Sequence, residues 1–552
     1  MAIPTYTQHR RAHSQLPSVI VVALFLFVCK CKAFTIPSIV RRSGVNVFNN
    51  ENIHYIPSLT NHEDNFFHQC MKSSTRSITS TSTSLYMSTT NGPYDKYTIQ
   101  ILMSDTGGGH RASANALRDA FDTLYPNQIE CDIVDIFTDY GPFFPINAFV
   151  PIYKIMAEYS FLWGWTYAWG ATPLGLWFNE LFLEVFCFDS FAKCMKRPIG
   201  SSGERADMVV SVHPLTQDIP LKILTSLDTD QQSRTKGRTT PFATVVTDLG
   251  GAHPTWFNPG VDKCFVPSDA LYQCALDRNV RPEQIIQHGL PIRKGFWGES
   301  KSGNISEQNT NNSKSFFSLD FFNNINNNNS KMMNSNSSKS RNTLRDELGL
   351  VGNIPTVLIV GGGDGMGGIT SQARAMGKKL NEKANEVNDG DNNPKYQIVV
   401  VCGKNAKAQN ELMSDQWGSG IVTKINGFVN NMDEWMRASD IIVTKAGPGT
   451  IAEASICGLP CMLSSYLPGQ EAGNIPFVES AGFGTYSGDE KVIADTVSTW
   501  LSSPEILATM KEAALQAARP SATTDIAKDI AGMLFETKNQ NEKVKERELV
   551  MQ

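Results

Sequence analysis

A glycine-rich turn that ends in a histidine carries the clearest chemical signal in the sequence. The segment Ser104–Arg111 reads SDTGGGHR, follows a β-branched run and precedes a helical pattern. Glycines at a strand-to-helix turn let the backbone approach a ligand closely and leave the helix N–H groups free. The imidazole of His110 suits a base that removes a hydroxyl proton at neutral pH. A histidine that merely caps the helix is the alternative interpretation.

Further glycine turns lie in the C-terminal half. The run Gly361–Gly368 reads GGGDGMGG and suits a diphosphate that rests on backbone amides, with a tight turn that binds no ligand as the alternative. The run Thr444–Ala454 reads TKAGPGTIAEA and repeats the order of strand, glycine turn and helix. Glu453 is expected in the first turn of that helix, where its carboxylate either accepts hydrogen bonds from a ribose diol or offsets the helix dipole. With the polar loop Pro468–Asn474, these turns predict a nucleotide-sugar donor site.

Short apolar runs separated by helical patterns must position these turns. Runs of this kind predict parallel strands covered on both faces, with ligands at their carboxyl ends. The fold class is therefore α/β, with two doubly wound parallel-sheet domains at 93–299 and 343–537 that face each other across a cleft. The predicted strands are Tyr97–Met103, Met208–Val212, Ala243–Val246, Gln284–Gln287, Thr356–Val360, Gln397–Val401, Asp440–Thr444 and Pro460–Ser464.

The remaining segments are predicted not to fold. Residues 1–92 combine a short apolar run, typical of a signal peptide, with a Ser/Thr-rich stretch typical of a transit peptide. They predict a mostly disordered bipartite leader to a plastid, whereas a secreted protein with a disordered N-terminus is the alternative. The Asn-rich stretch 300–342 predicts a disordered insertion, and 538–552 a charged tail.

Composition excludes several classes of protein. The chain of 552 residues has 49 Lys and Arg against 54 Asp and Glu, a net charge of −5 that argues against a nucleic-acid binder acting through bulk charge. Eleven cysteines without C-x-x-C spacing indicate reduced thiols, not a disulfide scaffold or a zinc cluster. A D-x-D pattern at Asp389–Asp391 lies in a polar stretch that predicts a surface turn, so no metal site is expected.

An uncharged stretch, Tyr159–Asn179, holds four of the nine tryptophans. Glycine and proline residues interrupt the stretch, which argues against a membrane-spanning helix. Trp and Tyr favour the headgroup level of a bilayer. It therefore predicts an interfacial patch or the wall of a lipid-acceptor site, with a pair of aromatic-rich core helices as the alternative. Lys193, Lys196 and Arg197 follow it and suit anionic lipid headgroups.

The motifs SDTGGGHRASA, HPTWF and TKAGPGTIAEA together resemble the monogalactosyldiacylglycerol synthases over about residues 97–517. That family consists of glycosyltransferases with the GT-B fold, similar to family 28. The resemblance implies an inverting transfer of galactose from UDP-galactose to the sn-3 hydroxyl of diacylglycerol, without a metal or cofactor, at the plastid envelope membrane. It also implies peripheral binding to anionic lipids such as phosphatidylglycerol or phosphatidic acid, and it leaves a homodimer open.

The resemblance further implies roles for individual residues. His110 would be the general base, and Asp248 would orient or assist it. Phe428 would lie beside the uracil and Glu453 on the ribose, while Gln470 and Glu471 would contact the sugar. The acceptor and lipid residues would be Gly108, Gly109, Pro151 and Trp256. The donor-binding residues would be Gly363, Gly365, Phe428, Lys445, Pro448, Gly449, Thr450, Glu453, Gln470, Glu471 and Asn474.

One departure from the family pattern and two alternative functions stay open at this point. Plant members usually carry polar residues and a cysteine where this chain has Gly250–Ala252, which leaves acceptor positioning in doubt. A transferase that uses UDP-glucose or UDP-N-acetylglucosamine on a lipid is one alternative function. A UDP-sugar-binding or lipid-transfer protein without catalysis is the other, although the intact His110 argues against it.

Overall fold

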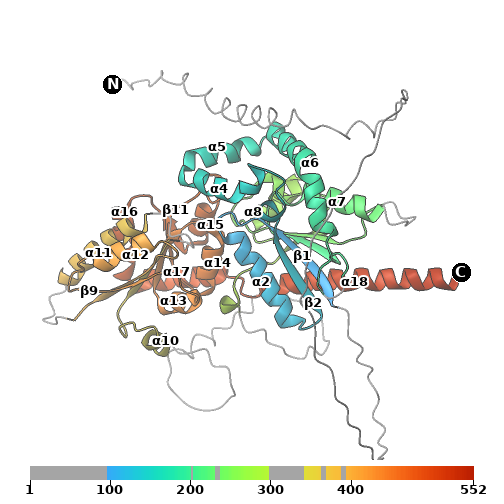
Figure 1. Ribbon diagram of the computed structural model, residues 1–552. Coiled ribbons are helices and arrows are strands. Elements are labelled where there is room, and N and C mark those ends of the chain that lie inside the picture. The colour runs from blue at the N-terminus through green and yellow to red at the C-terminus, as the bar shows by residue number, and fades with distance from the viewer. Residues whose placement is uncertain are drawn as a thin grey trace, which may run out of the picture. The chain divides into compact units, whose positions relative to one another are not determined.

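The computed structural model describes residues 96–200, 203–229, 237–297, 341–361, 368–386 and 393–551 (Figure 1). All of these residues belong to one compact unit, Thr89–Gln552. The predicted leader, 1–92, lies outside the described residues, and so does nearly all of the insertion predicted at 300–342.

The N-terminal half is built on a six-stranded sheet in the order β2-β1-β3-β4-β5-β6, with every neighbouring pair parallel. The order reverses between β1 and β3, and ligands of such sheets bind beyond the carboxyl ends of the strands at that point. The strands are β1 (Tyr97–Met103), β2 (Ile129–Asp135), β3 (Met208–Ser211), β4 (Phe242–Val245), β5 (Lys263–Val266) and β6 (Ile285–Gln287).

Helices of this half follow from the spacing of apolar residues and from their caps. In α2, Ala114, Leu117 and Phe121 are three and four residues apart, and all three are fully buried. Helix α6 begins with Pro173 after the cap residue Thr172, whose hydroxyl accepts from the Gly175 N–H. The helices are α2 (Gly109–Leu124), α3 (Ile136–Tyr140), η2 (Ile146–Ala148), α4 (Phe149–Glu158), α5 (Ser160–Gly170), α6 (Pro173–Lys196), α7 (Asp218–Thr229), η3 (Pro254–Trp256), α8 (Asp269–Asp277), η4 (Pro282–Gln284) and η5 (Lys294–Phe296).

The C-terminal half holds a second parallel sheet of six strands in the order β12-β11-β10-β7-β8-β9, which reverses between β10 and β7. The predicted fold class of two doubly wound parallel sheets is confirmed. The strands are β7 (Thr356–Val360), β8 (Tyr396–Val401), β9 (Ile421–Asn426), β10 (Ile441–Lys445), β11 (Cys461–Ser465) and β12 (Gly484–Tyr486). The helices are α10 (Arg341–Glu347), α11 (Ile369–Glu386), α12 (Ala406–Ser414), α13 (Met432–Ala438), α14 (Pro448–Ile456), α15 (Asn474–Ala481), α16 (Glu490–Leu501), α17 (Pro504–Ala517) and α18 (Ala522–Met551).

The last helix, α18, returns to the first sheet. Its residues Ile526, Ile530 and Leu534 are fully buried in one apolar cluster with Ile99 of β1 and Leu117 of α2. The sequence assigned this helix to the donor domain and expected a charged tail after residue 537, whereas α18 continues to Met551.

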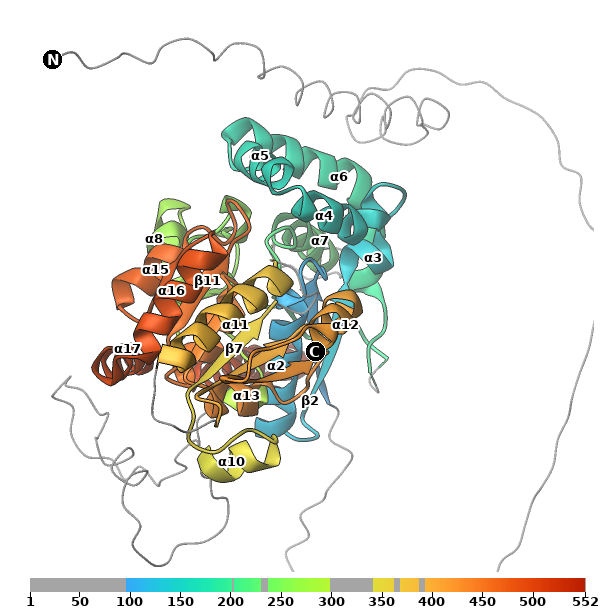
Figure 2. The same ribbon diagram turned by 90° about the vertical axis from the view of Figure 1, so that its left-hand side faces the viewer.

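The Trp-rich stretch Tyr159–Asn179 forms α5 and the first part of α6. Helices α4, α5 and α6 lie side by side in both views (Figures 1 and 2). Within the described ranges no helix is long and apolar enough to cross a membrane.

Candidate active site

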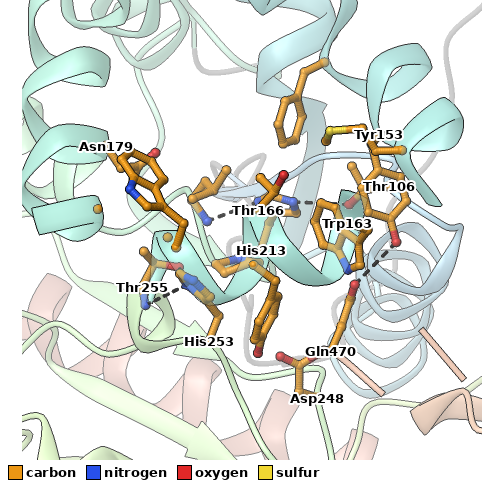
Figure 3. Close-up of a pocket in the computed structure, with 18 of the residues that line it drawn as sticks. Thr106, Tyr153, Trp163, Thr166, Asn179, His213, Asp248, His253, Thr255 and Gln470 are labelled. Atoms are coloured by element: carbon orange, nitrogen blue, oxygen red, sulfur yellow. Dashed lines mark hydrogen bonds between the residues drawn. The ribbon is translucent and has the colours of Figure 1, made fainter. Parts of the chain in front are cut away.

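A cavity of about 220 Å³ lies beyond the carboxyl ends of β1, β3 and β4 (Figure 3). Thr106, His213 and Asp248 follow these three strands and reach it from the sheet side. Side chains of α4, α5 and α6 close the opposite wall, and they are mostly apolar. The residues that matter most on this wall and beside it are Tyr153, Trp163, Tyr167, Asn179, His253 and Gln470.

His110 lines this cavity from the start of α2. Its Nδ1 lies 2.9 Å from the carbonyl oxygen of Val212 and 3.0 Å from Oγ1 of Thr247. A carbonyl can only accept, so Nδ1 carries the proton and Nε2 is left as the basic nitrogen. Burial lowers the pKa of His110 to about 4, although the bond to Val212 and the charge of Asp105 oppose this shift. The ring is therefore neutral at pH 7 and able to accept a proton.

The interpretation of His110 as a helix cap is wrong. Gly108 occupies the cap position of α2 with a left-handed φ of 75°, and no side chain caps this helix. A side chain added at Gly108 or Gly109 would meet nothing within 4 Å, so the positive φ, and not lack of space, favours glycine at position 108.

A second buried histidine, His213, stands beside the first. The two ring centroids are 4.7 Å apart in an edge-to-face arrangement. Its Nδ1 accepts from the Leu215 N–H at 3.2 Å, and its Nε2 lies 3.3 Å from Oγ1 of Thr106. Burial holds the pKa of His213 well below its usual value, with His110 adding to the shift. Sequence reasoning missed His213, although it directly follows a predicted strand, where ligands of parallel sheets bind.

Asp248 is in the cavity but does not orient His110. Its Oδ2 accepts from Nε1 of Trp256 at 2.7 Å, whereas His110 is held by Val212 and Thr247. Burial raises the pKa of Asp248 to about 7, which the Trp256 bond opposes and the charge of Glu471 increases. The predicted orienting role of Asp248 is therefore corrected.

Trp256 and Pro151 differ from their predicted places at the acceptor site. Trp256 is completely buried and does not line the cavity, and its indole N–H donates to Asp248, which does. Pro151 lies exposed on α4, while Tyr153 and Met156 of the same helix line the cavity. Neither predicted residue reaches the cavity itself.

A smaller cavity of about 100 Å³ lies in the C-terminal half. Phe428 and Thr450, both predicted to bind the donor, line it together with Arg293. Pro448 and Gly449 form the first turn of α14, next to Thr450. The predicted phosphate-binding glycines Gly363 and Gly365 lie outside the described residues.

Glu453 is not in the first turn of α14 but in the second, and no acidic residue occupies the first. Its buried carboxylate is held by the guanidinium of Arg293, with 2.7 Å between Nε and Oε1. Burial raises the pKa of Glu453, and Arg293 opposes the shift. Sequence reasoning missed Arg293, since nothing in the chain between β6 and α14 indicates that the two residues meet.

The remaining donor candidates all have partners within the protein. Lys445 forms an ion pair with Glu471, whose second oxygen accepts from the Leu467 N–H at 2.9 Å. Gln470 lines the large cavity, where Tyr153 Oη donates to its Oε1 at 3.4 Å.

Asn474 is a structural tie and not a donor ligand, in contrast to the prediction. Its side chain is completely buried. Its Oδ1 accepts from the Gly250 N–H and its Nδ2 donates to the Ala446 carbonyl, both at 2.8 Å. Both ends of the amide are therefore occupied by backbone groups.

In the part of the chain that the structure describes, no three His, Cys, Asp or Glu side chains gather in a way that could hold a metal ion. The Asp389–Asp391 pattern lies outside that part.

Comparison with known proteins identifies the family. Monogalactosyldiacylglycerol synthase 3 of Arabidopsis thaliana, named chloroplastic, is 35% identical over 434 residues, which cover 78% of this chain and 80% of that protein. The chloroplastic monogalactosyldiacylglycerol synthase of Spinacia oleracea is 36% identical over 433 residues, 78% of this chain and 72% of the relative. The chain belongs to the monogalactosyldiacylglycerol synthase family.

Two family profiles agree with this assignment. The profile described as monogalactosyldiacylglycerol (MGDG) synthase matches residues 110–292, and the glycosyltransferase family 28 C-terminal domain matches residues 356–529. Among solved structures, MurG of Acinetobacter baumannii is 14% identical with a TM-score of 0.44, covering 79% of this chain and 100% of that one. The UDP-GlcNAc 2-epimerase of Neisseria meningitidis, bound to UDP-GlcNAc, has a TM-score of 0.43 at 11% identity, covering 80% and 100%.

Proposed function

We propose that this synthase-family chain transfers galactose, with inversion, from UDP-galactose to the sn-3 hydroxyl of 1,2-diacylglycerol. The observation that carries the proposal is the neutral His110, whose basic Nε2 belongs to a cavity walled by apolar side chains of α4, α5 and α6. Galactose, and not glucose or N-acetylglucosamine, is favoured because the curated relatives are named as galactolipid synthases.

The proposed step is an in-line displacement at the anomeric carbon. Nε2 of His110 takes the proton of the acceptor hydroxyl as its oxygen forms the new bond to that carbon. The bond between the carbon and the diphosphate breaks, and UDP leaves with the electron pair. The backbone N–H groups at the start of α14, where Pro448 is the first residue, would stabilise its negative charge without a metal ion.

We also propose that the acceptor arrives from a lipid surface bound by α4, α5 and α6. Large apolar side chains are exposed along these helices, with Phe161 at 72% and Trp177 at 58%. The others are Ile155, Tyr159, Leu162, Leu174, Leu181 and Val185. Aromatic residues of this kind favour the headgroup level, and the same helices wall the cavity, so a diacylglycerol can pass from the bilayer to His110.

Anionic lipids such as phosphatidylglycerol or phosphatidic acid fit the charges at the end of α6. Lys193 and Lys196 are exposed there, whereas Arg197 is paired with Asp132 and is less available than the sequence suggested. We therefore propose peripheral binding at the plastid envelope.

Fusing residues 1–92 to a fluorescent protein tests whether these residues direct the protein to the plastid, and secretion of the reporter would refute this proposal. Sedimentation of the purified protein tests whether it forms a homodimer.

Labelled UDP-galactose, supplied to the purified protein with vesicles that contain diacylglycerol, tests the activity. We expect a galactolipid product, and slower turnover with UDP-glucose or UDP-N-acetylglucosamine. Absence of a galactolipid would overturn the proposal.

The variant His110→Ala tests the base. We expect kcat to fall by about 100-fold or more, because a positioned general base contributes about that much. His288→Ala is the matched control, since His288 does not line the cavity and contacts Asp529 of α18. Undiminished turnover in His110→Ala would remove the assigned base and leave the product assay to decide the activity.

A further inference from the structure

Helix α5 has two faces with different surroundings. Phe161 and Leu162 are exposed on the outer face, which belongs to the proposed lipid-binding surface. Trp163 and Tyr167 are directed inward and line the cavity. Docking on a bilayer therefore acts on an element that is also part of the active site.

The inner face packs directly on the donor loop, Leu467–Glu471. A Cβ added at Gly469 would lie 2.4 Å from Cδ1 of Tyr167, so the ring rests on the glycine backbone. One turn earlier, a Cβ at Gly164 would lie 3.0 Å from Cβ of Pro468. The loop has no space to move toward α5 while the helix is in this position.

Tyr153 of α4 extends the same contact to the residue proposed to bind the sugar. Its hydroxyl donates to Gln470, and its ring packs edge-to-face on Trp163 with centroids 4.8 Å apart. Figure 3 shows Tyr153, Trp163 and Gln470 directed toward one another. The indole N–H of Trp163 is buried and has no hydrogen-bond partner among the described residues. A buried donor without a partner costs free energy that a ligand oxygen at this place would recover.

The inner face of α5 also packs on the loop after β4. The rings of Tyr167 and His253 are 4.8 Å apart in an edge-to-face contact, and a Cβ at Gly170 would lie 3.3 Å from Nε2 of His253. Helix α5 therefore contacts both the HPTWF segment and the donor loop, and the Tyr167 ring touches each of them. A shift of the helix must disturb at least one of these contacts.

We propose that Tyr153 and Tyr167 are positioning residues that couple docking of α4 and α5 on a lipid surface to the placement of the donor loop. The enzyme on a membrane then binds UDP-galactose more tightly than the enzyme in solution. This inference rests on the proposed function. Because coupling between two binding sites is reciprocal, UDP-galactose also strengthens binding to the vesicle.

Titration of the full chain with UDP-galactose and with UDP tests this coupling. Both ligands are titrated without vesicles and with vesicles of phosphatidylcholine and phosphatidylglycerol that lack diacylglycerol, so that no acceptor is consumed. We expect vesicles to lower the Kd of UDP-galactose about fivefold or more, the lower end of typical coupling between sites. The Kd of UDP should stay unchanged, because the loop is proposed to contact the sugar and not the nucleotide.

Three variants separate coupling from a general defect. Tyr167→Ala should bind vesicles as the wild type does but show the same Kd for UDP-galactose with and without them. Tyr153→Phe keeps the ring and removes the bond to Gln470, and it should reduce the vesicle effect by about twofold, the lower end of what one hydrogen bond contributes. Phe161→Ala, on the outer face, should need a higher lipid concentration to bind vesicles. Once all of the variant is bound, vesicles should lower its Kd for UDP-galactose as much as they do for the wild type.

Several outcomes would overturn the inference. One is an equal vesicle effect on UDP and UDP-galactose, and another is undiminished coupling in both tyrosine variants. A wild-type enzyme that makes galactolipid but shows no vesicle effect on UDP-galactose affinity would refute the coupling and leave the proposed function intact.

Discussion

His110 and Asp248 line one cavity, and burial shifts their pKa values in opposite directions. Desolvation penalises the charged form of each group, so the pKa of His110 falls to about 4 and that of Asp248 rises to about 7. Near neutral pH the base is unprotonated, while the carboxyl group is close to its titration point. The two residues should therefore appear separately in the pH dependence of the reaction.

If ionised Asp248 assists His110, as the family resemblance implies, kcat/KM of the wild-type enzyme should fall below about pH 7 as Asp248 becomes protonated, and again toward about pH 4 as His110 does. In Asp248→Asn the decline near pH 7 should disappear, while the decline near pH 4 remains. Initial rates at low donor concentration measure both. A decline near pH 7 that persists in Asp248→Asn would show that the ionised carboxylate is not required.

Single residues were predictable where local chemistry defined them. The glycine turn indicated His110 because three glycines followed by a histidine, between a strand and a helix, are typical of a ligand-binding turn. The partner of Asp248 was not predictable, because it depends on the direction of the Trp256 side chain. Asn474 was mistaken for a ligand because a polar loop residue looks the same in sequence whether it binds a substrate or backbone groups.

At the scale of elements, two loops meet without any side chain between them. Gly250, after β4, lies against Gly473, before α15, so that a Cβ at Gly250 would be 1.9 Å from the Gly473 carbonyl oxygen. The Gly250 N–H also donates to Asn474. This contact gives a physical reason for glycine at a position where plant relatives were expected to carry other residues.

Gly250→Ala should therefore displace the loops, weaken UDP-galactose binding and lower stability by about 1–3 kcal/mol, the usual cost of overpacking. The neighbouring variant Gly251→Ala is the matched control, because its Cβ would meet nothing within 4 Å. Thermal unfolding and donor titration check both. Equal behaviour of the two variants would contradict the close contact.

Most strands inside the sheets were predicted, whereas three of the four strands at sheet edges were missed. The bounds of β1 and β7 match the prediction, because their residues are nearly all apolar and buried. Three of the missed strands, β2, β9 and β12, lie at sheet edges or beside solvent, and partly exposed residues interrupt their apolar pattern. Strand β5 was missed although β3 and β4 have the same length, because its sequence, KCFV, begins with a half-buried lysine and leaves a very short apolar run.

At the scale of the whole molecule, α18 ties the end of the chain to its first sheet. An amphipathic pattern shows that a helix buries one face, but it does not show which core receives that face. The sequence therefore placed α18 with the donor domain by proximity in the chain. In the structure, its apolar face completes the cluster of β1 and α2.

Ile530→Ala should lower the free energy of unfolding by about 2–5 kcal/mol, since it leaves a cavity in a fully buried cluster. Glu536→Ala, on the exposed side of the same helix, should change it by less than about 0.5 kcal/mol. Denaturant titration followed by tryptophan fluorescence measures both. A small loss in Ile530→Ala would show that α18 is dispensable for the first sheet.

The return of α18 also fixes the order in which the chain can finish folding. Strand β1 begins at residue 97, but the helix that covers it begins at residue 522, so the first sheet is synthesised long before its cover exists. Contacts this distant in sequence form late and leave apolar surface exposed in the meantime. A nascent or truncated chain that ends before residue 522 should therefore behave as a client of chaperones even though its donor sheet is complete.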